Sequence, residues 1–346
     1  MSESISLKQD YDALERRGML KRDIPAYIAD NIASAITLRP YQDRVLQRFF
    51  FYMEEEQRQR PSHLLFHMAT GSGKTVLMAS LILHLYAQGY RNFLFFVNSS
   101  NIIDKTKENF LNPVSSKYLF APDVTINDKR VNIREVANFD EAVDTDINIH
   151  FSTIQGLHTR LQNPKENAVT LEDFENRKIV LISDEAHHIN TLTKKSLGKE
   201  EQAEVNSWES TVSKIFQSDM NNLLLEFTAT IELEHSAIKA KYHDKILYDY
   251  SLRQFREDGY SKDVEVRQAD LPPLERMFQA VILSQYRRKV AEAHGLHIKP
   301  VILMKSKTIA ESKANEEAFH NYIAGLKEVI SDFIAGMTDR YPHQEV

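Results

Sequence analysis

The sequence contains no cysteine among its 346 residues. Disulfide bonds and cysteine-based metal sites are therefore excluded, and nothing indicates an oxidising compartment. No apolar run is long enough to span a bilayer, and residues 1–6 lack the basic and apolar regions of a signal peptide. We therefore expect a cytoplasmic protein that does not partner a membrane.

The chain also lacks an excess of positive charge. Its net charge is −6 and its pI is about 6.1. A nucleic-acid partner would therefore have to be held by a local patch or cleft. The hydrophobic content of 42% suffices for a buried core, and the length suits two ordinary domains or one large one. We find no internal repeat and no low-complexity tract.

A glycine-containing loop lies between an apolar strand pattern at residues 64–67 and an apolar helix pattern from Val76. In a phosphate-binding loop, glycines let backbone N–H groups surround a phosphate, and the helix N-terminus favours the anion. Met68 occupies the position where the general motif has its first glycine. Alternatively, the segment is a turn that happens to carry a lysine. We expect the loop to bind nucleotide through Thr70, Gly71, Ser72, Gly73, Lys74 and Thr75, with Lys74 on the β- and γ-phosphates and Thr75 on Mg²⁺.

Apolar strand patterns alternate with helix patterns along most of the chain. Continuous apolar strands separated by helices predict an α/β fold with a parallel sheet covered on both faces. Two segments, residues 115–142 and 191–209, are irregular or polar and are predicted to be surface insertions outside the sheet. A helix capped at Asp23 is expected in the N-terminal segment. We expect strands at residues 93–97, 147–151, 179–183 and 223–227, late edge strands at 245–250 and 264–266, a long helix at 274–293, and a new strand at 300–304 followed by a helix at 314–330.

These patterns predict four regions. Residues 1–37 form a helical preface, and residues 38–270 form the first nucleotide-binding domain. Residues 271–298 form a bridging helix, and residues 299–346 open a second α/β domain that is incomplete.

Two acids, Asp184 and Glu185, follow a buried strand pattern, where open α/β sheets bind ligands. In a phosphate-loop ATPase, Asp184 would hold Mg²⁺ and Glu185 would polarise the attacking water. Taken alone, the pair would more often be two solvated carboxylates. His187 and His188 could suggest zinc, but no cysteine is available, and a relay role suits His187 better. A third strand ends in Thr228-Ala229-Thr230, whose hydroxyls could bridge the acidic loop to the next element, or could be an ordinary strand terminus.

In combination, residues 68–75, Asp184-Glu185-Ala186-His187 and Thr228-Ala229-Thr230 resemble motifs I, II and III of superfamily 2 helicases and translocases. The doubled histidine, the loop sequence, and Tyr248-Asp249-Tyr250 followed by Asp258-Gly259-Tyr260 resemble the Res subunits of type III restriction enzymes. The resemblance covers about residues 38–304. It implies a RecA-like, DEAH-box ATPase that uses ATP and Mg²⁺, with His187, Thr228 and Thr230 coupling the nucleotide site to nucleic acid.

The resemblance also assigns binding roles elsewhere. Gln42, within Leu38-Arg39-Pro40-Tyr41-Gln42, would hydrogen-bond the adenine edge. Asn98, Ser99 and Ser100, and Thr153 in a later segment, would grip phosphates of one nucleic-acid strand. Lys105 and Lys107 would either add charge to this grip or simply be solvated. The implied partners are double-stranded DNA and a modification (methyltransferase) subunit.

Two features of the family are not recognised before Val346: the arginines of the second motor domain and the acids of a restriction nuclease. We therefore expect this chain alone to bind Mg-ATP, to hydrolyse it slowly and not to cleave DNA. The favoured function is the motor module of a type III restriction endonuclease. The alternatives are a helicase-like ATPase acting on DNA or RNA without a nuclease, and a nucleotide-switched binding module.

Overall fold

The structure is a computed structural model that describes residues 5–162, 170, 172–175, 177–184, 199–231, 235–261, 266, 268 and 270–340. The chain divides into two compact units, residues 1–263 and residues 264–346. Across the ranges just given, no helix is both long enough and apolar enough to cross a bilayer.

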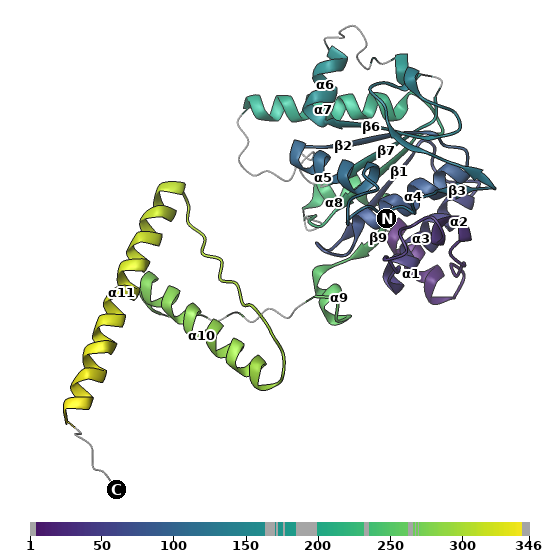
Figure 1. The fold of residues 1–346 in the computed structure, drawn as a ribbon. Coiled ribbons are helices and arrows are strands. Elements are labelled where there is room, and N and C mark those ends of the chain that lie inside the picture. Colours follow the sequence, from purple (N-terminus) through teal and green to yellow (C-terminus); the bar gives the residue numbers. More distant parts are fainter. Residues whose placement is uncertain are drawn as a thin grey trace. The chain divides into compact units, whose positions relative to one another are not determined.

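A seven-stranded sheet forms the centre of the first unit (Figure 1), in the order β5-β6-β2-β7-β8-β1-β9. Every neighbouring pair of strands is parallel. The predicted α/β class is confirmed. The strands are β1 (Ser62–Met68), β2 (Asn92–Val97), β5 (Ile133–Glu135), β6 (Ile147–Thr153), β7 (Ile179–Asp184), β8 (Leu223–Thr228) and β9 (Ile246–Tyr250); β3 (Thr125–Ile126) and β4 (Lys129–Arg130) form a separate antiparallel pair.

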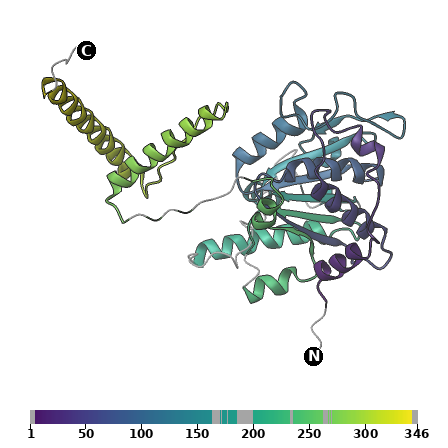
Figure 2. The same cartoon turned by 90° about the horizontal axis from the view of Figure 1, so that it is seen from below.

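Helices cover both faces of the sheet, as its continuous apolar strands require (Figures 1 and 2). Side chains of one strand alternate between the faces, so Phe93 and Phe95 of β2 join one core cluster while Leu94 and Phe96 join another. The first cluster is covered by α3 (Pro40–Glu54), α4 (Lys74–Ala87) and α5 (Ser100–Leu111). The opposite face is covered by α6 (Ile154–Gln162), α7 (Lys199–Gln217) and α8 (Ser236–Tyr242).

The N-terminal segment packs onto the sheet through α1 (Leu7–Arg16), which begins with a reciprocal cap between Ser6 and Gln9. Arg48 of α3 is only 5% exposed. Its Nη2 lies 2.7 Å from Asp12 Oδ1 and also contacts Glu15, while its Nη1 donates to the Leu247 carbonyl of β9 at 3.1 Å. One guanidinium therefore joins α1, α3 and the edge strand.

In the first unit, three predictions of secondary structure differ from the structure. The helix expected from Asp23 is only α2 (Ala26–Ala29), which begins after Pro25 because the residue before a proline, here Ile24, is disfavoured in the helical conformation. Within 115–142, β5 joins the main sheet, and the 3-10 helix η1 (Phe139–Glu141) follows it. Within 191–209, residues from Lys199 onward belong to α7; a second 3-10 helix, η2 (Glu172–Phe174), precedes β7.

The second unit contains α10 (Pro273–Ala293), which confirms the long helix, and α11 (Ile309–Arg340). Residues 300–304 do not form the expected strand, because the part of this unit that the structure describes offers no strand to pair with them. Ala291 is the only buried residue among its described side chains. Ile282, Tyr286 and Val290, spaced four apart on α10, are 51%, 66% and 40% exposed. The second α/β domain therefore stays a prediction.

The last elements of the first unit are β9 and the short helix α9 (Leu252–Glu257). β9 confirms the edge strand predicted at 245–250, where it pairs with β1 alone. The edge strand predicted at 264–266 includes residues outside the described part of the chain.

Candidate nucleotide-binding site

The loop between β1 and α4 has the backbone of a phosphate cradle. Gly71 and Gly73 both adopt left-handed conformations, with φ of +81° and +80°, a region that favours glycine. Gly73 is also the N-cap of α4, so the free N–H groups of this helix face the loop. Lys74 Nζ donates to the carbonyls of Met68 and Ala69 at 3.3 and 3.5 Å and thereby spans the loop. Thr75 follows in the first turn of α4.

The first turn of α3 holds this loop from one side. Tyr41 Oη and Gln42 Nε2 both donate to the Ser72 carbonyl, at 2.8 and 3.0 Å. Gln42 Oε1 accepts from the Arg39 N–H at 2.8 Å, and the Gln42 side chain is buried. The predicted contact of Gln42 with adenine stays a prediction. In the structure, the same amide braces the loop.

An aromatic cluster connects this turn to the end of β9. Tyr41 stacks on Tyr250 with ring centroids 4.4 Å apart, and both contact Phe255 of α9. Tyr260 packs edge-on against Tyr41 at 5.1 Å and lies under the Arg39 guanidinium. The Tyr250 hydroxyl donates to Asp258 at 2.6 Å. Burial, followed by this carboxylate, raises the pKa of Tyr250, which stays a neutral donor. Aromatic residues of the segment 248–260 therefore pack together with Tyr41 beside the loop.

The threonine motif ends β8, the strand next to β1, and the acidic motif ends β7, the strand beyond it. Asp184 is the last residue of β7 and lies opposite Phe227 of β8 in the sheet register. Thr228 ends β8 and lies opposite His67 of β1. Thr228 Oγ1 donates to the Thr230 carbonyl at 2.8 Å and accepts from the Thr230 N–H at 3.2 Å, which forms a tight turn. Glu185 and His187 lie outside the described residues. The structure thus brings the loop, Asp184 and Thr228 to one edge of the sheet.

The residues present at this edge fit a nucleotide phosphate with its metal. The buried Ser72 hydroxyl has no hydrogen-bond partner. A Cβ at Gly73 would lie 2.4 Å from Gln42 Nε2, so the cradle is closed to a side chain there. β1 and β7 are separated by one strand, which places their ends about 10 Å apart. Lys74 would contact a nucleotide phosphate at this place, and Thr75 and Asp184 would supply oxygen ligands for Mg²⁺.

The predicted nucleic-acid residues gather farther along the same edge. Val97 of β2 pairs with Thr153 of β6, so Asn98, Ser99 and Ser100 follow the strand next to Thr153. Ser99 is the N-cap of α5, and Asn98 and Ser100 are exposed. Thr153 Oγ1 accepts from the Gly156 N–H at 3.0 Å and caps α6. Lys107 forms an ion pair with Glu135 at 2.5 Å, whereas Lys105 is exposed.

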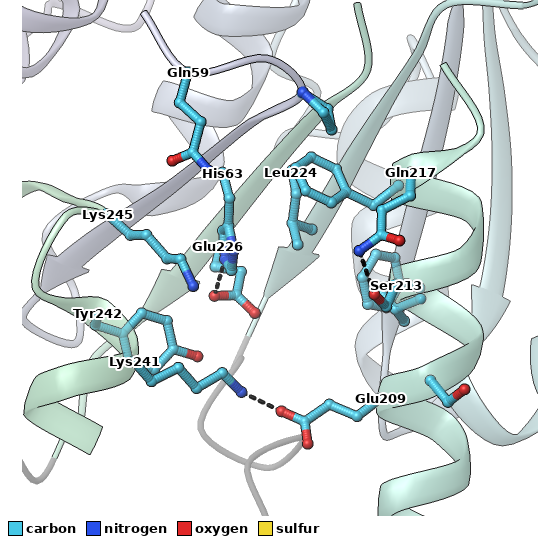
Figure 3. A pocket seen from close by; sticks show the side chains of 15 residues that line it. Gln59, His63, Glu209, Ser213, Gln217, Leu224, Glu226, Lys241, Tyr242 and Lys245 are labelled. Atoms are coloured by element: carbon cyan, nitrogen blue, oxygen red, sulfur yellow. Dashed lines mark hydrogen bonds and ion pairs between the residues drawn. The ribbon is translucent and has the colours of Figure 1, made fainter. Parts of the chain in front are cut away.

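A separate pocket of about 480 Å³ opens on the sheet face between α7 and α8 (Figure 3). His63 Nε2 lies 2.7 Å from Glu226 Oε2 within it, and Lys241 pairs with Glu209. Burial alone would raise the pKa of Glu226, but the combined contacts with His63, Lys241 and Tyr242 lower this pKa below its ordinary value. This pocket contains none of the predicted site residues.

The contacts made by Tyr41, Tyr250, His67 and Asp249 are not predicted by the sequence. His67 lies 2.7 Å from Asp249 across β1 and β9, although 182 residues separate the two in sequence. The only local signal was the tyrosine-rich pattern at 248–260, which carried the family resemblance without indicating its contacts.

A phosphate-type loop follows β1, a threonine turn ends the neighbouring strand β8, and an acid ends β7. This arrangement defines an α/β protein of the phosphate-loop class. The family model described as "Type III restriction enzyme, res subunit" matches residues 35–233, more than half of the chain. The chain belongs to this family.

A curated relative is the "Probable type III restriction-modification enzyme HindVIP Res subunit" of Haemophilus influenzae. It is 38% identical over 304 residues, which cover 82% of this chain and 59% of the relative. The aligned part thus spans well under two thirds of that protein.

Two solved structures are similar at lower levels. The Hef helicase domain of Pyrococcus furiosus is 17% identical, with a TM-score of 0.38, over 74% of this chain and 48% of that one. The DNA-bound type ISP restriction-modification enzyme LlaBIII is 15% identical, with a TM-score of 0.43, over 64% of this chain and 16% of that one. Scores this low add nothing to the fold described above.

Proposed function

We propose that this chain is the ATP-binding motor module of a DNA-translocating, helicase-like ATPase within a type III restriction enzyme Res subunit. The observation that carries the proposal is the meeting of the phosphate loop, Asp184 and Thr228 at one sheet edge, in a member of this family. Lys74 would contact the β- and γ-phosphates, and Thr75 with Asp184 would hold Mg²⁺. Bound Mg²⁺ would neutralise the charge that develops on the phosphates.

The chain's own residues would supply the rest of the site. Backbone N–H groups at Gly71, Ser72 and Gly73 would surround the β-phosphate, and the N-terminus of α4 would add partial positive charge. Glu185, just after β7, would orient the attacking water. Tyr260 and Arg39 lie together on the α3 side of the aromatic cluster. The adenine would bind there and would be hydrogen-bonded by Gln42.

Double-stranded DNA is the polymer that we infer, and Asn98, Ser99, Ser100 and Thr153 would contact its phosphates. Phosphate contacts of this kind carry no sequence information. A modification subunit would therefore read the DNA sequence, and we place the assembly in the cytoplasm. Turnover by these 346 residues would be slow, because none of their segments resembles the arginine motif of the second motor domain.

Calorimetric titration with Mg²⁺ and the slowly hydrolysed analogue ATPγS tests the nucleotide site. We expect binding by the wild-type chain and at least a tenfold loss in Lys74→Ala. Lys105→Ala, an exposed lysine on α5, is the matched control and keeps wild-type affinity. Equal binding by the wild type and Lys74→Ala would contradict the proposed site.

Fluorescence anisotropy with labelled duplex DNA and with RNA of the same sequence tests the polymer. We expect tighter binding to duplex DNA and a steep fall in affinity as salt rises, because each phosphate contact releases counterions. Preference for RNA would favour the alternative helicase-like function. Binding that does not change with salt would contradict a phosphate grip.

A further inference from the structure

His67 occupies a junction between three strand ends. It is the residue before Met68, where β1 enters the phosphate loop. In the sheet register it lies opposite Asp249 of β9 on one side and Thr228 of β8 on the other. Its Nδ1 lies 2.7 Å from Asp249 Oδ1, and its Nε2 lies 3.3 Å from the Ala229 carbonyl. One imidazole therefore contacts β9 on one side and the residue that follows β8 on the other.

Both partners of the ring are hydrogen-bond acceptors. A carboxylate oxygen and a carbonyl oxygen both accept, and each ring nitrogen faces one of them. The side chains are 15% and 25% exposed, so solvent competes only in part.

The contacts of His67 connect the phosphate loop, on the β1 side, with the Thr228–Thr230 turn, on the β8 side. On the β1 side, Met68 and Ala69 follow His67, and their carbonyls accept from Lys74 Nζ. The Ala69 N–H donates to the Tyr250 carbonyl at 3.0 Å, which fixes the loop entrance to β9. On the β8 side, Ala229 is the central residue of the turn closed by Thr228 and Thr230. The phosphate loop and this turn are therefore connected through the His67 side chain.

We propose that His67, oriented by Asp249, is a positioning residue that couples the phosphate loop to the Thr228–Thr230 turn, so that nucleotide binding changes the affinity for duplex DNA. The inference rests on the proposed function and deepens it, because it names the contact through which the two sites communicate. Coupling between two binding sites is reciprocal and is measured as the ratio of affinities with and without the second ligand.

β1 contains a second histidine–carboxylate pair, which does not contact the phosphate loop or the Thr228–Thr230 turn. His63 lies four residues before His67, so both side chains point to the same face of β1. His63 pairs with Glu226 at the same 2.7 Å (Figure 3). This contact lies within the strands, away from the loop and from Ala229. His63→Ala therefore removes a similar histidine–carboxylate pair without touching the proposed connection.

The experiment measures the dissociation constant of fluorescein-labelled duplex DNA for the full chain, with and without saturating Mg²⁺ and ATPγS. We expect the nucleotide to change the DNA affinity of the wild type by a factor of about 5 to 150, the usual range for linked sites. In His67→Ala, the ratio should fall to within about twofold of one. ATPγS affinity, measured by calorimetry, should stay within about threefold of wild type, and His63→Ala should keep the wild-type ratio.

A second variant separates this role from simple structural support. His67→Gln has an amide that can still donate to the Ala229 carbonyl, and it should keep a larger ratio than His67→Ala, even if the alanine variant folds poorly. A wild-type ratio of one, an unchanged ratio in His67→Ala, or equal loss in His63→Ala would overturn the inference while leaving the proposed function in place. If the wild-type chain bound neither ligand, the proposed function would fail, and the inference with it.

Discussion

At the scale of single residues, the two left-handed glycines of the phosphate loop differ in their surroundings. Gly71 and Gly73 have nearly the same φ. A Cβ at Gly71 meets nothing within 4 Å, whereas a Cβ at Gly73 would lie 2.4 Å from Gln42 Nε2. Backbone strain is therefore common to both positions, and the collision is specific to Gly73.

Alanine substitution should separate these two effects. Gly71→Ala should cost about 1 to 2 kcal/mol of unfolding free energy, the strain of a left-handed alanine. Gly73→Ala should cost more and should weaken ATPγS binding at least tenfold, because Gln42 must move away from Ser72. Adding Gln42→Ala to Gly73→Ala should recover part of the lost stability. Urea unfolding of the four proteins measures this, and equal costs for both glycine variants would contradict the steric explanation.

His84 shows how burial makes one residue sensitive to pH. It lies within α4, where its ring packs on Phe50 at 4.3 Å and its Nδ1 lies 2.9 Å from the Tyr27 hydroxyl. Burial lowers the pKa of His84 to about 4, against 6.5 for an exposed histidine. The folded state therefore resists a proton that the unfolded state accepts.

The stability of the protein should fall with acidification in this interval. The contribution of neutral His84 is complete above the unfolded pKa of about 6.5 and is lost as the pH falls towards 4. Between pH 7.5 and pH 5, this residue should cost about 2 kcal/mol of unfolding free energy. Urea titrations at the two pH values test this. His84→Gln should show a smaller difference, whereas the exposed control His294→Gln should behave as wild type, and an unchanged difference in His84→Gln would exclude this residue as the cause.

At the scale of elements, α1 is held to the motor fold by the guanidinium of Arg48. Asp12 and Glu15 of α1 are about one third exposed, whereas Arg48 is nearly buried. The contact of Arg48 with Leu247 extends the network to β9, the strand that also contains Asp249. Loss of the guanidinium would leave Asp12 with Lys8 at 2.7 Å and Glu15 with Arg44 at 4.0 Å as their remaining counter-charges.

Arg48→Met should therefore destabilise the chain by about 2 kcal/mol, less than a fully buried pair because solvent reaches the two acids. Arg44→Met, one turn earlier on α3, is the matched control. Its guanidinium is 41% exposed and lies 4.0 Å from Glu15, so we expect a change below about 1 kcal/mol. The midpoints of urea unfolding compare the two, and similar losses would show that the α1 contact contributes little.

The sequence predicts those parts of the site that local geometry determines. A strand, a glycine turn and a helix within residues 64–83 place Lys74 and Thr75 without any distant contact, and Asp184 needs only the end of its own strand. Contacts such as Tyr41 with Tyr250, or His67 with Asp249, depend on β9 pairing with β1, and strand order is not encoded in any single segment. β5 was missed for a related reason, since three residues are too few for a periodic pattern.

Residues 300–304 were predicted to form a strand, but they do not form one in the structure. An apolar run such as Val301-Ile302-Leu303 has a high strand propensity, but a strand also needs a neighbour with which to form hydrogen bonds. Propensity alone therefore predicted an element that the chain does not form in this structure.

At the scale of the whole molecule, the two units have different means of stabilisation. The first has an extensive core on both faces of its sheet, whereas the described side chains of the second include a single buried residue, Ala291. The first unit should therefore fold by itself.

A fragment of residues 1–261 should unfold cooperatively at nearly the urea concentration of the full chain and should bind ATPγS within about twofold of its affinity. A fragment of residues 266–340 should show helical circular dichroism without a cooperative transition, because few apolar contacts stabilise it. Loss of nucleotide binding in the first fragment would mean that the second unit contributes to the site.

The sheet order has a consequence for biosynthesis. β1 lies between β8 and β9. The nearer of these two strands in sequence is β8, which begins at Leu223, the partner of Ser62. At translation rates of about 5 to 20 residues per second, roughly 10 to 30 s pass between the synthesis of β1 and of β8. During this interval the ribosome presents an apolar strand with both edges unpaired, followed directly by the apolar helix α4. Nascent chains of this protein should therefore depend on a chaperone at the exit tunnel until β8 and β9 have been made.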